Sequence, residues 1–213
     1  MLVLILPRLC RACLTLGENR LTKHPMSPLA AIIRSLTESD LSAAIAVQAA
    51  VYPTPLLEES EALASRLHLP KSYCLAAVCD GRLTAYLLAH GWPRQSPPPL
   101  DSELRPERQT EVLYIHDLAV APLGRGLRLR QRLLQRAFEL AVRDKLSDAE
   151  LIAVEGAAPY WRRLGFIEPE VPGGLRSKVA AYEKSARWMA RALPLCGSPW
   201  LGAGALPGSP APD

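Results

Sequence analysis

The chain has 213 residues, of which 49% are hydrophobic and 22% charged, so it can bury a core but is short for two full-sized domains. Its formal net charge of +4 suits phosphate-bearing small molecules and falls short of a nucleic-acid-binding arm, so we expect no nucleic-acid partner. No apolar run approaches the roughly 20 residues that cross a bilayer, so we expect a soluble protein without a membrane partner.

The cysteines indicate the redox environment of the protein, and the composition of the two ends indicates where the folded domain begins and ends. The five cysteines form an odd set without paired spacings, which predicts neither a disulfide framework nor a metal site and is typical of a reduced, cytoplasmic protein. We interpret the lone CxxC pair, Cys10 and Cys13, as coincidental because no second pair completes a site. Residues 1–27 form a poorly patterned extension, and residues 194–213 are rich enough in Pro, Gly and Ser to predict a disordered tail. The predicted domain therefore spans residues 28–193.

The first part of this domain predicts one strand followed by two helices. Residues 31–36 form a short β-branched run typical of a strand. Residues 37–40 supply helix-capping side chains ahead of an apolar series over residues 41–48. After a break at two prolines, residues 56–67 resume a helical spacing, with acidic side chains in the first turn where the helix dipole favours them.

The next segment predicts a β-hairpin and a long loop. Residues 72–79 and 82–92 are strand-like runs separated by Asp80-Gly81, a dipeptide that tolerates positive φ and favours a two-residue hairpin turn. We expect these strands to pair antiparallel. Residues 93–110 carry too many prolines for a strand within a ladder, and loops of this length are often functional.

The last third of the domain predicts a parallel crossover. Residues 111–120 form a strand, residues 123–143 the strongest amphipathic helix of the chain, and residues 149–154 a further buried strand. Three shorter elements follow: a helix at 157–164, a strand at 165–168 and a final strand at 187–193. The predicted fold class is therefore α/β (α+β), a mixed and mostly antiparallel sheet flanked by helices with one parallel crossover after the third long strand.

The segment after Tyr114 predicts an anion site. It runs YIHDLAVAPLGRGLRLRQRLLQRAF, which is a strand, a turn marked by proline and two glycines, and a long basic helix. A helix N-terminus presents unpaired backbone N–H groups, and a glycine-containing turn lets a phosphate approach them. Arg125 and Arg128 add positive charge. The alternative reading is a tight strand-to-helix connection beside a solvated arginine face.

Here the chain resembles the GNAT superfamily of N-acetyltransferases. The motif L-x-V-x-P-x-x-[QR]-G-x-G-x-[GA], which binds the pyrophosphate of acetyl-CoA in that family, is matched without a gap by Leu118, Val120, Pro122, Arg125 and Gly126. The family's second block, A-x-x-[FY]-[YW]-x-x-x-G-F, resembles residues 157–166. The resemblance implies a GNAT-like fold, acetyl-CoA as co-substrate without a metal, and a set of residues that contact it: Leu118, Ala119, Val120, Arg125, Gly126, Leu127, Arg128, Leu129, Arg130 and Trp161.

The chain departs from the family pattern at two places. Arg128 and Arg130 stand where the motif has glycines, so Arg128 could obstruct the turn or fold outward and pair with a CoA phosphate. In an alternative register, Gly124 and Gly126 serve as the permissive positions. Trp161 stands where many relatives carry a tyrosine that protonates the departing thiolate, and an indole cannot do this acid chemistry. Tyr160 precedes it but points about 100 degrees away on a helix.

His116 is the predicted general base. An amine must lose a proton before it can attack a thioester, and histidine is the side chain best poised near neutral pH. By strand alternation His116 shares a face with Tyr114 and Val120, whereas Asp117 points to the opposite face unless a bulge intervenes. The alternative is a structural His116 satisfied by a carboxylate such as Asp117.

The long loop and one histidine also resemble the arylalkylamine N-acetyltransferase branch. In that branch, histidines at the positions matching Tyr114 and His116 line the proton path, and only the second is present here. We therefore expect His116 to act directly or through water, with Tyr114 as helper. His90, on the preceding strand, could border the acceptor pocket or pack at the rim of the loop.

Together these observations predict an acetyl-CoA-dependent N-acetyltransferase that moves an acetyl group to a primary amine by direct transfer. The alternative is a noncatalytic GNAT-like module that binds CoA or a partner. The sequence leaves open whether a small amine, an aminoacyl compound or a protein terminus accepts the group, and whether the protein is a monomer or a homodimer.

Overall fold

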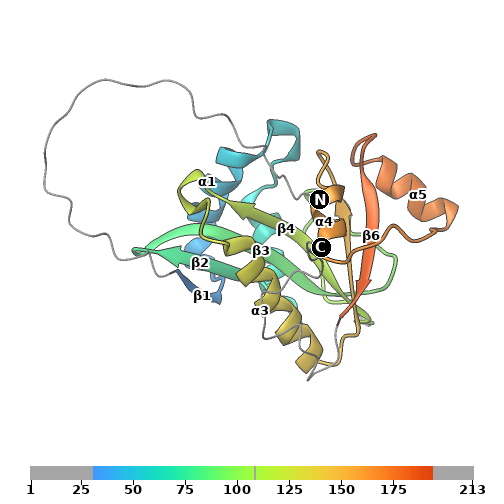
Figure 1. The fold of residues 1–213 in the computed structure, drawn as a ribbon, viewed down its shortest axis with the longest axis horizontal. Helices are drawn as coiled ribbons and strands as arrows, with labels where there is room; N and C mark the ends of the chain where they lie inside the picture. Colours follow the sequence, from blue (N-terminus) through green and yellow to red (C-terminus); the bar gives the residue numbers. More distant parts are fainter. Residues whose placement is uncertain (1–30, 108, 194–213) are drawn as a thin grey trace, which may run out of the picture.

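A computed structural model of the protein describes residues 31–107 and 109–193, so the predicted extension and tail lie outside the described residues. Six strands form one mixed sheet in the order in which they occur along the chain (Figure 1). Neighbouring strands pair antiparallel, except for β4 and β5, which are parallel. The strands are β1 (Ile32–Ser35), β2 (Leu75–Cys79), β3 (Arg82–Trp92), β4 (Val112–Val120), β5 (Asp148–Ala153) and β6 (Arg187–Ala192). The predicted fold class is confirmed.

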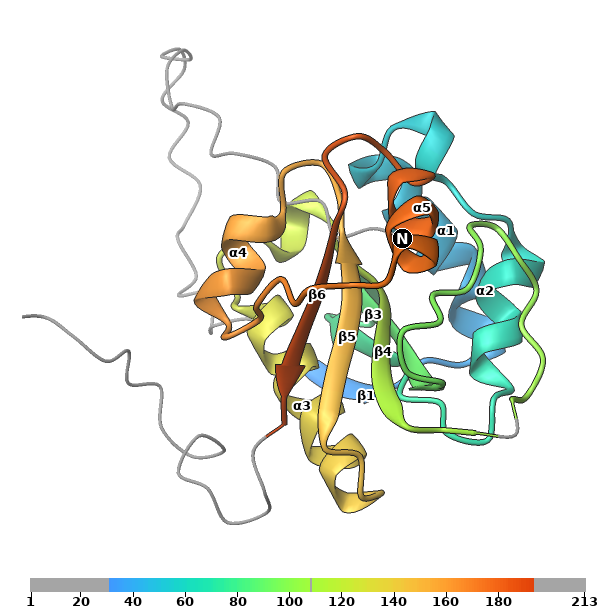
Figure 2. The same ribbon diagram turned by 90° about the vertical axis from the view of Figure 1, so that its right-hand side faces the viewer.

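Helices cover both faces of this sheet (Figures 1 and 2). One face carries α1 (Leu41–Val51), α2 (Ser60–Leu67) and α5 (Gly173–Ala180), and the other carries α3 (Leu129–Arg143) and α4 (Ala158–Arg163). Each face has its own cluster of buried apolar side chains. Burial of these two clusters provides the main favourable free energy of folding. None of the helices in the described part of the chain is long and apolar enough to span a membrane.

The predicted hairpin and crossover are both present. Asp80 (φ 48°) and Gly81 (φ 73°) form the turn between the antiparallel strands β2 and β3. The chain leaves β4, passes through α3 and returns to the sheet at β5, which makes β4 and β5 the parallel pair. The positive φ of both turn residues is the physical reason for the Asp-Gly signal.

Three predicted elements differ from the structure, and one helix was not predicted. The second helix, expected from residue 56, begins at Ser60. The long helix begins at Leu129 rather than at residue 123, because Pro122–Gly124 form a 3₁₀ turn and Gly126 has a φ of 85°. The strand expected over residues 165–168 is a single bridge between Ile167 and Ala190. Helix α5 was not predicted, since it starts with two glycines and buries only two side chains, Leu175 and Val179.

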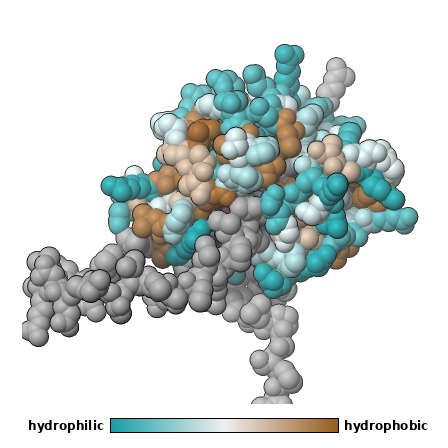
Figure 3. Space-filling view, turned by 90° about the horizontal axis from the view of Figure 1, so that it is seen from above, coloured by the Kyte–Doolittle hydropathy of each residue, from teal (hydrophilic) through white to brown (hydrophobic). Residues whose placement is uncertain are grey.

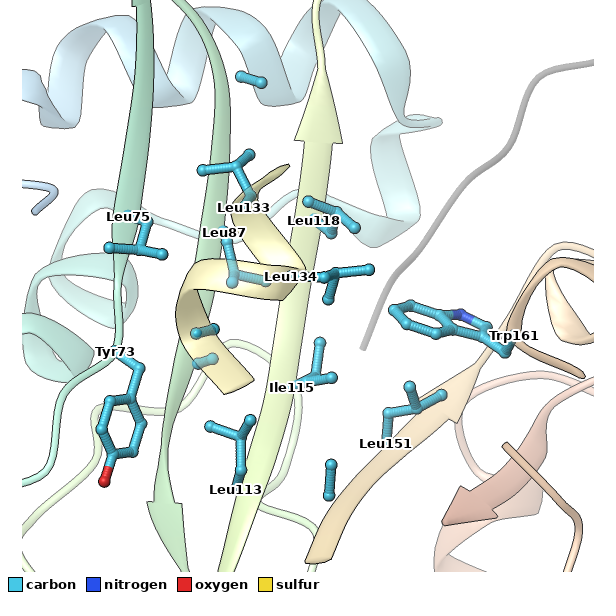
Figure 4. Packing of buried hydrophobic residues seen from close by; sticks show 14 of the residues in the cluster. Tyr73, Leu75, Leu87, Leu113, Ile115, Leu118, Leu133, Leu134, Leu151 and Trp161 are labelled. Atoms are coloured by element: carbon cyan, nitrogen blue, oxygen red, sulfur yellow. The ribbon is translucent and has the colours of Figure 1, made fainter. Parts of the chain in front are cut away.

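β4 and β5 diverge soon after they begin to pair. Their register is limited to Leu113 opposite Ala149 and Tyr114 opposite Glu150. Figure 4 shows the two strands separating, with the ring of Trp161 lying between them. Backbone N–H groups on this edge of β4 therefore have no partner strand beyond Tyr114 in the described sheet.

The surface mixes apolar and hydrophilic residues. In the view from above, apolar patches are bordered by hydrophilic side chains (Figure 3). Large apolar side chains that remain exposed include Ile32, Leu123 and Ile167. Leu123 lies in the 3₁₀ turn that follows β4, next to the predicted anion site.

Candidate active site

A β-bulge in β4 places the candidate catalytic residues. Opposite β3, Leu88 pairs with Asp117 but the next residue, Ala89, pairs with Ile115, so His116 is an extra residue in β4. A bulge shifts strand alternation by one position. His116 and Asp117 consequently face the same side as Tyr114, toward α1 and α2.

This corrects the expectation from simple alternation. Val120 packs in the cluster on the α3 side of the sheet and does not share a face with His116. Asp117 lies on the His116 face because the bulge reverses the order of the following side chains. The carboxylate that satisfies His116 is that of Glu58, not that of Asp117.

His116 is part of a buried network with Glu58 and Arg66. Its Nε2 lies 2.8 Å from Glu58 Oε2 and 3.1 Å from Glu58 Oε1. The Arg66 guanidinium lies 2.8 Å from Glu58 Oε1, and the side chains of His116 and Arg66 are both fully buried. Glu58 is fixed from its backbone as well, since its N–H donates to Gln48 Oε1 at 2.6 Å.

The electrostatics of this network define the protonation state of His116. Burial opposes ionisation of Glu58, but His116 and the Arg66 guanidinium outweigh it and lower the pKa of this carboxyl to about 2. Burial and the Arg66 charge lower the pKa of His116 to about 3, despite the neighbouring Glu58. His116 is therefore neutral at neutral pH and faces an ionised carboxylate.

The tautomer follows from this geometry. A carboxylate only accepts hydrogen bonds, so the Nε2–H of the neutral ring must donate to Glu58. The other ring nitrogen, Nδ1, then carries a lone pair, and it is buried without a hydrogen-bond partner among the described residues. An unoccupied lone pair on a neutral imidazole is what a general base requires.

The rings of His90 and Tyr114 lie beside that of His116. The His90 ring lies 6.2 Å from that of His116, 5.8 Å from that of Tyr114 and 5.0 Å from that of Trp92. Burial, together with the positive charge of Arg66, lowers the pKa of His90 well below 6.5, so it is neutral. His90 is thus fully buried beside the candidate base rather than at a loop rim.

Tyr114, the predicted helper, is also completely buried. Its ring lies 6.4 Å from that of His116 and stacks on Trp188 at 6.3 Å. Burial and the neighbouring Tyr182 raise the pKa of Tyr114 well above 10.0, so it is a neutral phenol that can donate or accept a hydrogen bond.

The described part of the long loop, residues 93–107 and 109–110, contacts this network through Asp101 and Ser102. The backbone N–H of Asp101 donates to Glu58 Oε1 at 3.0 Å, and the carbonyl of Ser102 accepts from Arg66 at 3.4 Å. The hydroxyl of Tyr182 donates to the carbonyl of Pro98. The loop is therefore tied to the same carboxylate that orients His116.

The turn after β4, where the sequence predicts an anion site, leaves its backbone open at one glycine. Gly126 (φ 85°) has open space where a Cβ would lie, so the backbone can approach a ligand there. Gly124 is needed for packing, because a Cβ would meet the side chain of Leu129 at 2.9 Å and the carbonyl of Thr84 at 3.1 Å. Helix α3 then begins with N–H groups that precede its first internal hydrogen bond, from Arg132 to Arg128.

The arginines of this turn fit a phosphate-bearing ligand. Arg125 and Arg128 are exposed, and the Nε of Arg130 is buried without a partner among the described residues. Arg128 itself has a φ of 54°, a left-handed conformation that favours glycine and explains why the family motif has glycine there. The side chain points to solvent instead of filling the turn.

Trp161 lies on α4 and is fully buried in the cluster on the α3 side. It packs edge-on against Tyr160 and Phe166, and its indole Nε1 has no hydrogen-bond partner within the described residues. Burial raises the pKa of Tyr160 to about 12, so this neighbouring phenol is neutral at neutral pH. Both rings belong to the apolar packing on the α3 side of the sheet.

Glu58 and Arg66 are the site residues that the sequence analysis did not single out. Neither has a motif, and Glu58 lies 58 residues before His116 in the chain. The one available signal is Arg66, which occurs on the apolar face of α2 next to buried Ala62 and Leu63. Buried arginines are almost always paired, so this position hints at a carboxylate partner. The described residues include no group of three His, Cys, Asp or Glu side chains that could hold a metal ion.

The six-stranded sheet with one parallel pair, the diverging strands and the helices on both faces define a GNAT-like mixed α/β fold. A family model described as Acetyltransferase (GNAT) family matches residues 35–166, and the chain belongs to this family. No curated protein matches the chain in sequence. The resemblance to the arylalkylamine branch stays a prediction.

Solved structures share the fold at low identity. The ribosomal-protein-S18-alanine N-acetyltransferase of Escherichia coli is 16% identical, with a TM-score of 0.57 over 79% of this chain and 97% of that one. The PaiA N-acetyltransferase of Thermoplasma acidophilum, in complex with coenzyme A, is 15% identical, with a TM-score of 0.54 over 76% and 99%. The GphF GNAT-like decarboxylase, in complex with isobutyryl-CoA, is 18% identical, with a TM-score of 0.59 over 76% and 100%.

Proposed function

We propose that the protein is an acetyl-CoA-dependent N-acetyltransferase that acetylates a small primary amine by direct transfer, with His116 as general base. The observation that carries this proposal is the buried, unpartnered Nδ1 of a neutral His116 whose Nε2 lies against Glu58. The proposal is supported by membership of the acetyltransferase family and by the CoA-bound structures that share the fold.

Acetyl-CoA fits the residues of the turn and of β4. The exposed Arg125 and Arg128, the open backbone at Gly126 and the first N–H groups of α3 suit its pyrophosphate. The unpaired edge of β4 over Leu118–Val120 offers N–H groups that can orient a thioester carbonyl. When bound there, acetyl-CoA supplies an activated acetyl group.

The protein residues then handle the proton. His116 Nδ1 accepts a proton from the ammonium group of the acceptor, which leaves a neutral amine. The nitrogen lone pair forms the new N–C bond to the carbonyl carbon while the C–S bond breaks and its electrons leave with sulfur. The nitrogen then loses its second excess proton, which the thiolate takes up, so the products are the amide and the free CoA thiol. Glu58 stabilises the resulting imidazolium at 2.8 Å, while Tyr114 helps to line the path. Trp161 supplies no proton.

Thiol release from acetyl-CoA in the presence of a panel of amines tests the proposal. His116→Ala is expected to lower kcat at least 100-fold at pH 7, with part of the activity restored at higher pH, where the amine is already deprotonated. Glu58→Gln keeps the size of the side chain but removes the charge that stabilises the imidazolium, so an intermediate loss is expected. A variant pH profile equal to that of the wild type would disprove the role of His116.

The alternative is a noncatalytic CoA-binding module, which Arg128, Arg130 and Trp161 favour because they replace the residues typical of the family motifs. Calorimetric titration with acetyl-CoA distinguishes the two. Micromolar binding without thiol release for any amine would replace the enzyme with the binding module. Binding together with His116-dependent thiol release would exclude it.

A further inference from the structure

A second buried acid lies next to His116 and is not used in the proposed chemistry. The Asp117 side chain is almost fully buried, and its two oxygens accept hydrogen bonds from two phenols. Tyr52 donates to Oδ1 at 2.5 Å and Tyr86 donates to Oδ2 at 2.5 Å. The Tyr52 hydroxyl also lies 3.2 Å from the carbonyl of Leu118.

These two tyrosines come from different elements. Tyr52 ends α1, and Tyr86 lies on β3 opposite Ala119 of β4. The three side chains, Tyr52, Tyr86 and Asp117, form what we call the Asp117 clamp. It joins a helix, a strand and the bulged segment of β4 through buried hydrogen bonds.

Burial of a carboxyl costs free energy unless the group is hydrogen-bonded, and Asp117 is buried only because both of its oxygens accept hydrogen bonds. Burial raises the pKa of Asp117 to about 7, whereas the hydrogen bonds from Tyr52 and Tyr86 act in the opposite direction. The bulge also needs support, because an extra residue interrupts the ladder with β3. If β4 paired regularly here, one of His116 and Asp117 would turn to the α3 face of the sheet.

We infer that Asp117 is a positioning residue, which Tyr52 and Tyr86 hold so that the β4 bulge keeps His116 directed toward Glu58 and the acceptor side. The inference rests on the proposed function for its catalytic meaning. Asp117 follows His116 directly and lies beside Leu118, so the clamp fixes the backbone between the base and the proposed thioester-binding edge. A displacement of about 1 Å in such a site can lower the rate of transfer about 100-fold.

The test compares variants that remove the clamp to different extents. Asp117→Ala removes both phenol contacts, Tyr86→Phe removes one hydroxyl, and Asp117→Asn keeps a side chain that can accept from one phenol and donate to the other. Tyr73→Phe is the matched control, because its hydroxyl donates to the carboxylate of Asp144 at 3.0 Å away from the site.

The readouts are kcat and KM for acetyl-CoA and the ¹⁵N NMR signals of the His116 ring. We expect Asp117→Ala to lower kcat at least tenfold and Tyr86→Phe to lower it about fivefold. In both variants, KM for acetyl-CoA should change less than threefold. The signal of the Nε2–H tautomer should be lost or averaged in both. Asp117→Asn should remain within threefold of the wild type, and Tyr73→Phe should change neither readout.

Two results would overturn the inference. A fall in melting temperature with unchanged kcat and unchanged His116 signals would show that the clamp is only structural. Loss of activity in Asp117→Asn equal to that in Asp117→Ala would show that the charge, not the positioning contacts, matters. If Asp117→Ala fails to fold, Tyr86→Phe carries the test, and if no amine is acetylated, the NMR arm still decides on the clamp while the proposed function fails.

Discussion

Arg128 offers a substitution in which stability and affinity should change in opposite directions. The residue has a φ of 54° and an exposed side chain at the start of α3. A non-glycine residue costs about 1–2 kcal/mol in this left-handed conformation. Glycine loses about 0.5–1 kcal/mol more backbone entropy on folding, so Arg128→Gly should stabilise the protein by about 0.5–1 kcal/mol. For a domain of this size, the melting temperature should rise by about 1–4 °C.

The same substitution removes a cation from the proposed pyrophosphate site. An exposed guanidinium contributes about 1 kcal/mol to an ionic contact, which corresponds to about a fivefold weaker dissociation constant for acetyl-CoA. Arg128→Ala separates the two effects, because it removes the charge and keeps a Cβ in the left-handed conformation. It should weaken binding to the same extent without the gain in stability.

Calorimetric titration with acetyl-CoA and thermal unfolding of the three proteins measure both quantities. Raising the salt concentration should reduce the difference in affinity between wild type and Arg128→Gly, because exposed charges are screened. Tighter binding by Arg128→Gly would refute the outward-facing arginine and show that the side chain obstructs the turn.

Two further predictions concern stability. The pKa of His116 is lowered to about 3 from 6.5 and that of Glu58 to about 2 from 4.5, so their stabilising contributions are complete above the unfolded values and are lost as the pH falls through these windows. The pKa of Asp117 is raised to about 7, so its contribution to the free energy of unfolding changes with pH in the opposite direction. The contribution of His116 is therefore measured as the difference between wild type and His116→Gln in denaturant unfolding from pH 7 to 4. The same dependence of unfolding free energy on pH in both proteins would contradict the prediction. Gly124→Ala should destabilise the protein by about 1–3 kcal/mol, because the added Cβ overpacks the turn. Gly174→Ala in α5 has open space for a Cβ and should stabilise the protein by about 0.5–1 kcal/mol. Thermal unfolding measures both, and an unchanged melting temperature of Gly124→Ala would show that the turn can relax.

Local chemistry explains which parts of the fold could be predicted from the sequence. The Asp80-Gly81 turn needs positive φ at both residues, and α3 repeats apolar side chains at helical spacing, so each leaves a signal within a short window. Helix α5 leaves almost none, because two glycines open it and only Leu175 and Val179 contact the core.

The candidate site shows more clearly what local sequence patterns do not predict. His116 could be found from a short motif, but the bulge that places it depends on the pairing between β3 and β4, which no local pattern records. The helical spacing from residue 56 predicts Glu58 as an acid in the first turn of a helix, and this is wrong: the structure places Glu58 two residues before α2 and buries it against His116. Long-range pairing and burial decide such positions, and alternation alone predicted the wrong face for Asp117.

The separation of the two apolar clusters by the sheet has an evolutionary consequence. The turn, α3 and α4 pack on one cluster, whereas α1, α2 and the tethered loop pack on the other, and β4 is shared between them. Substitutions in α1, α2 or the loop that leave Tyr52 and β4 unchanged lie outside the apolar cluster beneath the proposed coenzyme turn. Under the proposed function, proteins that descend from this one can therefore change their acceptor while the residues around acetyl-CoA stay the same.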